Sequence, residues 1–259
     1  MIAISAVNQD RELKVAQGKV PNYTIINKFG TNDNVGTTMV PITRAGVFQT
    51  PTTAQSLEIV SSSSDDSSGG TGARTFYIQG LDENWNLQEE IVTMNGTTAV
   101  AIPGSWFRVF RGYVVDSGTY ATSSAGSHAG TITVRGSGGG STWMEVGLIA
   151  GFPAGQSQIG VYTIPAGKTG YLWVKHFTVS TVKAANIFLF QRINADDTTA
   201  PFGAMRLIEQ NDGIAEPYNY QPKFPLVSLA EKTDVGFMAY VATGSGSVSV
   251  DFQIQLVDN

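Results

Sequence analysis

The sequence predicts an all-β fold of two β-sandwich, jelly-roll-like domains that follow an extended N-terminal arm. Apolar residues alternate with a period of two along many short runs, and helical periodicity is almost absent. Turn residues separate these runs at the spacing typical of sandwiches and barrels. The 259 residues, 42% of them hydrophobic, suffice for more than one domain. We therefore divide the chain into an arm (1–45), a first sandwich (46–140) and a second sandwich (146–259).

The arm contains short extended pieces, RELKVA and YTIINKF, with few core positions. Five Lys and Arg residues against three acids make it slightly basic in an acidic protein. A terminal segment with so few buried positions is usually ordered by something outside itself. We expect a neighbouring subunit to hold the arm.

The first sandwich begins with a strand that includes Leu57 and Ile59, and the polar stretch SSSSDDSSGGTGAR follows at 61–74. We interpret this stretch as a long connection between two strands, because a domain boundary there would leave the first strand without partners. The dipeptide Asn95-Gly96 predicts a hairpin. Alternation predicts four sets of residues that share a face: Phe76 with Ile78; Phe107, Val109, Tyr113 and Val115, opposite Arg108 and Phe110; Tyr171, Trp173, Phe177 and Val179; and Val248, Val250, Phe252 and Leu256.

The second glycine-rich stretch, RGSGGGSTW at 135–143, is the better candidate for a domain boundary. A segment of Gly and Ser is flexible by composition. The same residues also form tight turns between strands, so the turn remains an alternative to the linker.

Composition excludes several classes of function. The net charge is −5 and no basic stripe is present, so we expect no nucleic acid as a partner. The chain has no run of 18 apolar residues and no secretory signal at its start, so we expect no membrane partner. Cysteine is absent, which removes disulfides, thiolate metal ligands and cysteine nucleophiles.

The ionisable residues form no recognisable catalytic or metal motif. His128 and His176 are too far apart in sequence for a zinc-binding spacing, and we favour structural or surface roles for both. Calcium could use Asp65 and Asp66, although solvated turn residues are the simpler interpretation. Adjacent carboxylates do not supply the facing pair that glycosidases need. The acidic pairs are Asp65-Asp66, Asp82-Glu83, Glu89-Glu90 and Asp196-Asp197.

Two further patterns have simpler explanations than a ligand site. PAGKTG at 165–170 ends like a phosphate-binding loop, but Tyr162 replaces the required first glycine and a strand-like run follows. The four tryptophans could form a sugar-stacking surface, and packing is the simpler account: Trp85, Trp106, Trp143 and Trp173. We therefore expect no enzyme, and no catalytic, cofactor-binding or metal-binding residue.

Several phrases resemble a recurrent virion structural protein of tailed, especially marine, bacteriophages. The most specific is GTGARTFYIQGLDENWNLQEEIVTMNGTT (70–98). The phrases NKFGTNDNVGTT, YTIPAGKTGYLWV, EKTDVGFMAYV and FQIQLVDN fit the same type, so the resemblance covers roughly 25–115 and 160–259. It implies an all-β, non-enzymatic particle component and carries over no functional residue.

These observations lead to one expected function and two alternatives. We expect a capsid decoration or cement protein, assembled in the host cytoplasm and localised to the virion. Its expected partners are itself, as a homotrimer, and the major capsid protein or another virion protein. The alternatives are a tail, neck or baseplate/fibre component, or a β-sandwich module that binds a host glycan.

Overall fold

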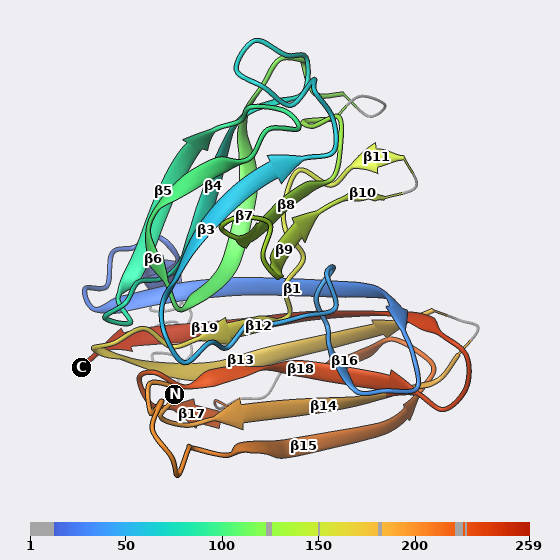
Figure 1. The fold of residues 1–259 in the computed structure, drawn as a ribbon. Coiled ribbons are helices and arrows are strands. Elements are labelled where there is room, and N and C mark those ends of the chain that lie inside the picture. Colours follow the sequence, from blue (N-terminus) through green and yellow to red (C-terminus); the bar gives the residue numbers. More distant parts are fainter. Residues whose placement is uncertain (1–12, 123–125, 150, 181–182, 221–224, 226) are drawn as a thin grey trace.

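The computed structural model describes residues 13–122, 126–149, 151–180, 183–220, 225 and 227–259, and nearly all of its regular structure is β-strand (Figure 1). Among these residues, one helical turn at 13–16 is the only α-helical segment. The all-β prediction is confirmed. The strands form four main antiparallel sheets and one small hairpin.

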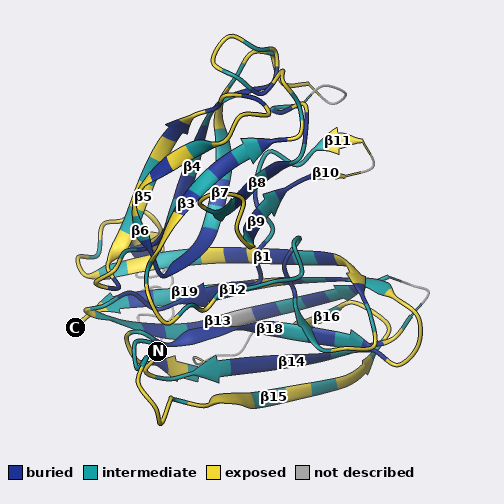
Figure 2. Cartoon of the chain, viewed as in Figure 1, coloured by how far each residue is buried: buried dark blue, intermediate teal, exposed yellow. Residues whose placement is uncertain are grey.

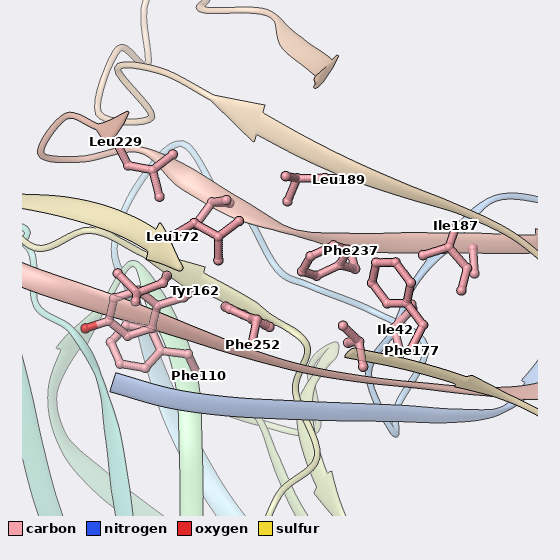
Figure 3. Close-up of a cluster of buried hydrophobic side chains, with 14 of the residues drawn as sticks. Ile42, Phe110, Tyr162, Leu172, Phe177, Ile187, Leu189, Leu229, Phe237 and Phe252 are labelled. Atoms are coloured by element: carbon pink, nitrogen blue, oxygen red, sulfur yellow. The ribbon is translucent and has the colours of Figure 1, made fainter. Parts of the chain in front are cut away.

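Two of the sheets stack into a C-terminal sandwich, drawn in the lower half of Figure 1. Sheet I has the order β1 (Tyr23–Val35), β19 (Gly246–Asp258), β13 (Lys168–Val179) and β16 (Tyr218–Tyr220), with β17 (Val227–Leu229) also paired to β13. Sheet II has the order β12 (Val161–Thr163), β18 (Asp234–Val241), β14 (Ala185–Arg192) and β15 (Met205–Ile214), with β2 (Val40–Pro41) paired to β18. Aromatic side chains fill the space between these sheets, among them Phe177, Phe237 and Phe252 (Figure 3).

The other two sheets form a second unit, drawn in the upper half of Figure 1. Sheet III has the order β6 (Val100–Trp106), β3 (Gln55–Ser61), β8 (Ile132–Gly136) and β9 (Thr142–Val146). Sheet IV has the order β5 (Leu87–Thr93), β4 (Ala73–Leu81) and β7 (Arg108–Ser117). A separate hairpin consists of β10 (Leu148–Ile149) and β11 (Phe152–Pro153). Leu57, Ile59, Phe76 and Ile78 lie in a buried cluster, as their alternation predicts, and this cluster also includes Val161 and Phe190 of sheet II.

The N-terminal segment differs from the predicted arm. Strand β1 pairs with β19 from Tyr23 opposite Val257 to Asn32 opposite Val248, so residues 23–35 belong to sheet I. Strand β2 likewise belongs to sheet II. Residues 1–12 of the predicted arm lie outside the described residues. The segment between β2 and β12 is therefore an insertion into the C-terminal sandwich, and we call residues 46–158 the insertion.

The glycine-rich stretch at 135–143 is a hairpin turn rather than a boundary. It joins β8 to β9, which pair with each other inside sheet III. Gly138 and Gly139 have φ angles of +74° and +78°, a backbone region that glycine adopts without steric cost. Glu58 of β3 accepts hydrogen bonds from both of their N–H groups, each 3.0 Å long, and from Arg135 Nε at 2.7 Å. The hairpin turn is thus fixed from the neighbouring strand, and the first sandwich continues past residue 140.

Irregularities in the strands change two of the predicted faces. A β-bulge between Leu172 and Val174 shifts the alternation of β13, so Phe177 and Val179 share their buried side with Leu172 rather than with Tyr171. A bulge lets two residues of one strand oppose one residue of its partner, which reverses the faces beyond it. The start of β7 lies between the two units, so Arg108 and its neighbours are buried on both faces. The predicted shared face of β19 is confirmed.

The dipeptide Asn95-Gly96 forms a turn but not a hairpin. It follows β5 of sheet IV and precedes β6 of sheet III, and these two strands do not pair. Gly96 has a φ of +61°, and its carbonyl oxygen accepts a hydrogen bond from the N–H of Ser61. The turn therefore carries the chain from one sheet to the other.

Candidate functional site

The polar stretch at 61–74 connects β3 to β4, as predicted, and folds around one buried carboxylate. Asp66 is fully buried, so it is not the solvated turn residue that we expected. Its two oxygens accept hydrogen bonds from the Ser61 hydroxyl and from the N–H groups of Ala73 (2.8 Å), Ala129 (2.8 Å) and Gly130 (2.9 Å). A buried carboxylate needs such donors because burial removes its hydration. Asp66 therefore ties two distant loops together.

Glycine in the GTGAR phrase has a steric reason. A Cβ atom at Gly72 would lie 2.0 Å from Asp66 Oδ1, far inside van der Waals contact. The phrase that supports the family resemblance is thus the part of the loop that packs against the buried carboxylate.

The remaining ionisable candidates do not assemble into a site. His128 is buried, and its Nδ1 lies 2.7 Å from the carbonyl oxygen of Gly130. His176 lies on β13, 3.4 Å from Asp251. Within the described ranges, no group of three or more His, Cys, Asp and Glu side chains could hold a metal ion. The structure describes no helix that is long and apolar enough to cross a membrane.

The PAGKTG phrase is a turn into a strand, as predicted. Gly167 has a φ of +72° and β13 begins at the next residue. The Gly167 N–H donates to a carboxylate oxygen of Glu231. The backbone N–H of Gly167, which in a phosphate-binding loop would donate to a phosphate, therefore donates to the carboxylate of Glu231.

The tryptophans mostly serve packing. Trp85, Trp106 and Trp143 are all buried, so they form no exposed sugar-stacking surface. Trp85 stacks on Phe107 with ring centroids 4.7 Å apart. The interpretation as packing residues is confirmed for these three.

A buried ion pair joins the insertion to the C-terminal sandwich. Arg108 of β7 donates from Nε to Asp234 Oδ1 (2.9 Å) and from Nη2 to Asp234 Oδ2 (2.8 Å), and both side chains are almost completely buried. The Thr163 hydroxyl also donates to Asp234. The guanidinium lies 4.9 Å from the Trp85 ring centroid. We call these four residues the junction. Sequence reasoning missed it, because its partners are distant in the chain and no local pattern marks either of them.

Other contacts fix the two units against each other. Phe110 of the insertion lies beside Tyr162 of β12, with ring centroids 4.5 Å apart (Figure 3). Lys28 of β1 donates to the carbonyl oxygen of Phe110. Burial, and to a lesser degree the charge of Arg111, lowers the pKa of Lys28 well below its ordinary value. The units thus share a buried, hydrogen-bonded interface rather than a flexible tether.

The exposed surface carries three groups of large apolar side chains. One is the β10–β11 hairpin, a second is the start of β15 with Phe202 from the segment before it, and a third is the outer face of sheet IV (Figure 2). On that face Ile91, Tyr77 and Tyr113 form one row across three strands, and the two tyrosines stack at 4.5 Å. The apolar groups are Leu148, Ile149 and Phe152; Phe202, Met205 and Leu207; and Leu87, Ile91 and Val115.

One polar groove lies beside the β8–β9 turn, with a volume of about 690 Å³. Gln49, the irregular segment 51–54 and the start of β3 form one wall, and Gly136, Ser137, Gly140 and Ser141 form the other. Trp143 also lines it. We call this the polar groove.

Comparisons with known proteins assign no family. No protein-family model matches the chain, and no curated protein matches it. Among solved structures, the VP2 capsid protein of infectious bursal disease virus (D431N mutant, T=1 particles) covers 92% of this chain and 76% of its own, with 13% identity and a TM-score of 0.21. A chain of the T13 particle of the same virus covers 96% and 81%, with 11% identity and a TM-score of 0.22. Scores this low carry no argument, and the proposals below rest on other observations.

Proposed function

We propose that the chain is a non-enzymatic structural protein of a tailed-bacteriophage virion. Within that class, we propose a capsid decoration or cement protein that binds the head shell as a homotrimer and stabilises it. Its partners would be further copies of itself and the major capsid protein or another virion protein. The observation that carries the proposal is the set of apolar side chains left exposed on strands. The resemblance of residues 70–98 supports a bacteriophage virion as the particle.

The β10–β11 hairpin is the clearest of these exposed elements. Nine consecutive residues, 147–155, carry no charged or hydrogen-bonding side chain. Leu148, Ile149 and Phe152 are 36–43% exposed. A two-stranded hairpin is marginally stable alone in water, and Arg44 holds the base of this one through the carbonyl oxygen of Leu148 (3.0 Å).

Burial of these side chains in an assembly would be favourable. Complete burial of a large apolar side chain contributes about 1.5–3 kcal/mol, so covering the exposed part contributes roughly 1 kcal/mol for each of the three. Exposed apolar groups of this kind mark sites of protein association more often than isolated apolar residues do. A neighbouring virion subunit is the occupant that we propose.

A count of copies in purified particles tests the proposal. Quantitative mass spectrometry of virions should find the chain, at a copy number comparable with that of the major capsid protein. A low copy number would contradict decoration and favour the tail, neck or baseplate alternative. Absence from the particle would contradict the virion proposal itself.

Variants of the hairpin link this test to the structure. The double variant Ile149→Ser and Phe152→Ser should fold normally and lose occupancy on the particle. Tyr120→Ser is the matched control, because Tyr120 is 89% exposed and lies outside the three groups. Equal occupancy of both variants would show that the hairpin is not the contact. Light scattering of the isolated protein tests the trimer.

A further inference from the structure

We propose that the polar groove is a binding site for a neutral glycan. This inference is independent of the virion proposal, because it concerns a different surface of the insertion. It rests on the residues that line the groove, on the hydrogen bonds that fix its walls and on its size.

The lining of the groove contains no ionisable side chain. Threonine and serine hydroxyls and two glutamine amides dominate it, with Pro51, Ala54 and Trp143 as the apolar members. A phosphate, carboxylate or ammonium ligand would lose hydration here without meeting an opposite charge, which is unfavourable. A lipid would leave the hydroxyl and amide groups unpaired. The hydroxyl-bearing and amide members are Gln49, Thr52, Thr53, Gln55, Ser56, Ser137 and Ser141.

Hydroxyl and amide groups match the chemistry of a sugar. Each hydroxyl can donate one hydrogen bond and accept others. The amide nitrogens of Gln49 and Gln55 already donate within the protein, so these two residues offer a ligand mainly their amide oxygens. Sugar hydroxyls also donate and accept, so they can pair with such a wall without any change of charge. The volume of about 690 Å³ lies in the range usual for small-ligand sites, on the order of 300–1,000 Å³.

The two walls are held before any ligand arrives. Ser137 N–H donates to the carbonyl oxygen of Ser56 (3.0 Å), and Gln49 Nε2 donates to the carbonyl oxygen of Thr142 (2.8 Å). Glu58 fixes the Gly138–Gly139 part of the turn. A preformed site loses less conformational entropy on binding, which favours affinity.

Trp143 supplies an apolar part to this polar site. Trp143 is 6% exposed, so the groove meets only a small part of the residue. Trp143 therefore serves mainly as packing beneath the groove, and the hydroxyl and amide groups of the walls would make most of the contacts with a sugar. Trp143 also provides a fluorescence signal at the site.

Binding is tested with a panel of neutral hexasaccharides built from glucose, galactose, mannose or N-acetylglucosamine, immobilised on an array. Each hit is then titrated in solution and followed by tryptophan fluorescence, with sulfated and sialylated oligosaccharides as the charged comparison. We expect saturable binding of at least one neutral hexasaccharide and weaker binding of the charged ones. Failure of every neutral probe, or equal binding of the charged probes, would overturn the proposal.

A pair of variants locates the binding site. Thr52→Val with Ser137→Ala removes two exposed hydroxyls and should weaken binding about ten-fold. Each hydroxyl is expected to make one hydrogen bond to the glycan, and each lost bond accounts for about half of the binding free energy that a ten-fold change represents. Thr97→Val with Ser68→Ala makes the same changes at exposed positions outside the groove and should leave binding unchanged. Equal affinity of both double variants would place the glycan elsewhere and contradict the inference. Incorporation into particles, measured in parallel, reports on the virion proposal separately.

Discussion

Removal of the buried arginine at the junction gives the sharpest test of how the two units are joined. In Arg108→Met, Asp234 would keep the Thr163 hydroxyl as a donor and lose both guanidinium bonds, while remaining 2% exposed. Breaking a buried ion pair by removing one partner costs about 3–5 kcal/mol, because the other charge stays buried without compensation. We expect the free energy of unfolding of Arg108→Met to fall by that amount.

The double variant Arg108→Met with Asp234→Leu separates the pair from its surroundings. It removes both charges and leaves the Thr163 hydroxyl without its acceptor, which costs about 1–3 kcal/mol. The double variant should therefore lose much less stability than the sum of the two single variants, since the single variants share one broken interaction.

Urea unfolding followed by tryptophan fluorescence measures these differences, and Trp85 lies against the guanidinium as a local reporter. Lys168→Met is the matched control, because its pair with Asp258 is partly exposed and should contribute at most about 1 kcal/mol. Salt should weaken the control pair and leave the junction unaffected. A loss at Arg108 no larger than that of the control, or a double variant equal to the sum of the single variants, would refute the reasoning.

Three further predictions concern the loops and the edge of the sandwich. Gly72→Ala should lower the free energy of unfolding, measured in urea, by about 1–3 kcal/mol, since its Cβ would collide with Asp66. Gly69→Ala is the control: its Cβ would lie in open space, so the free energy of unfolding should change by less than about 1 kcal/mol. The Gly138 N–H and Arg135 lower the pKa of Glu58. The ionised Glu58 therefore contributes its full stabilisation of the fold above its ordinary pKa of 4.5, and this stabilisation disappears as the pH falls through the lowered pKa. The difference in free energy of unfolding between wild type and Glu58→Gln should vanish on acidification, and a constant difference would contradict the prediction. Lys175→Met should destabilise the protein because Glu209 loses its ion-pair partner and, among the described residues, keeps only the Asn211 amide as a donor. Restored stability in Lys175→Met with Glu209→Met, measured by thermal unfolding, would support the pairing.

The sequence predicted the strands better than their partners. The period of two located the buried faces of β4 and β19, because local alternation records which side of a strand is buried. It could not reveal that β1 pairs with β19, since the two strands are far apart in the sequence. The low density of core positions in 23–35 suggested an arm, whereas much of β1 is half-buried in the sandwich.

Contacts between residues distant in sequence also explain why the domain boundary was misassigned and why the junction was not predicted. Gly and Ser compose both flexible linkers and tight turns, and Glu58, which fixes the turn at 138–139, lies about 80 residues earlier in the chain. Asp66 looked like a solvated acid because its surroundings in sequence are polar. Its burial depends on Ala129 and Gly130, which come from a separate loop.

The pairing of β1 with β19 sets an order for biosynthesis. The insertion contains all the strands of sheets III and IV and can fold while the ribosome is still translating. Strand β1 must remain unpaired until β19 has been translated, and every strand of the insertion precedes β19 in the chain. We expect truncated translation products to carry a folded insertion and an open outer sandwich with exposed strand edges. Completion of sheet I would then distinguish chains that contain β19 from shorter fragments before any of them enters an assembly.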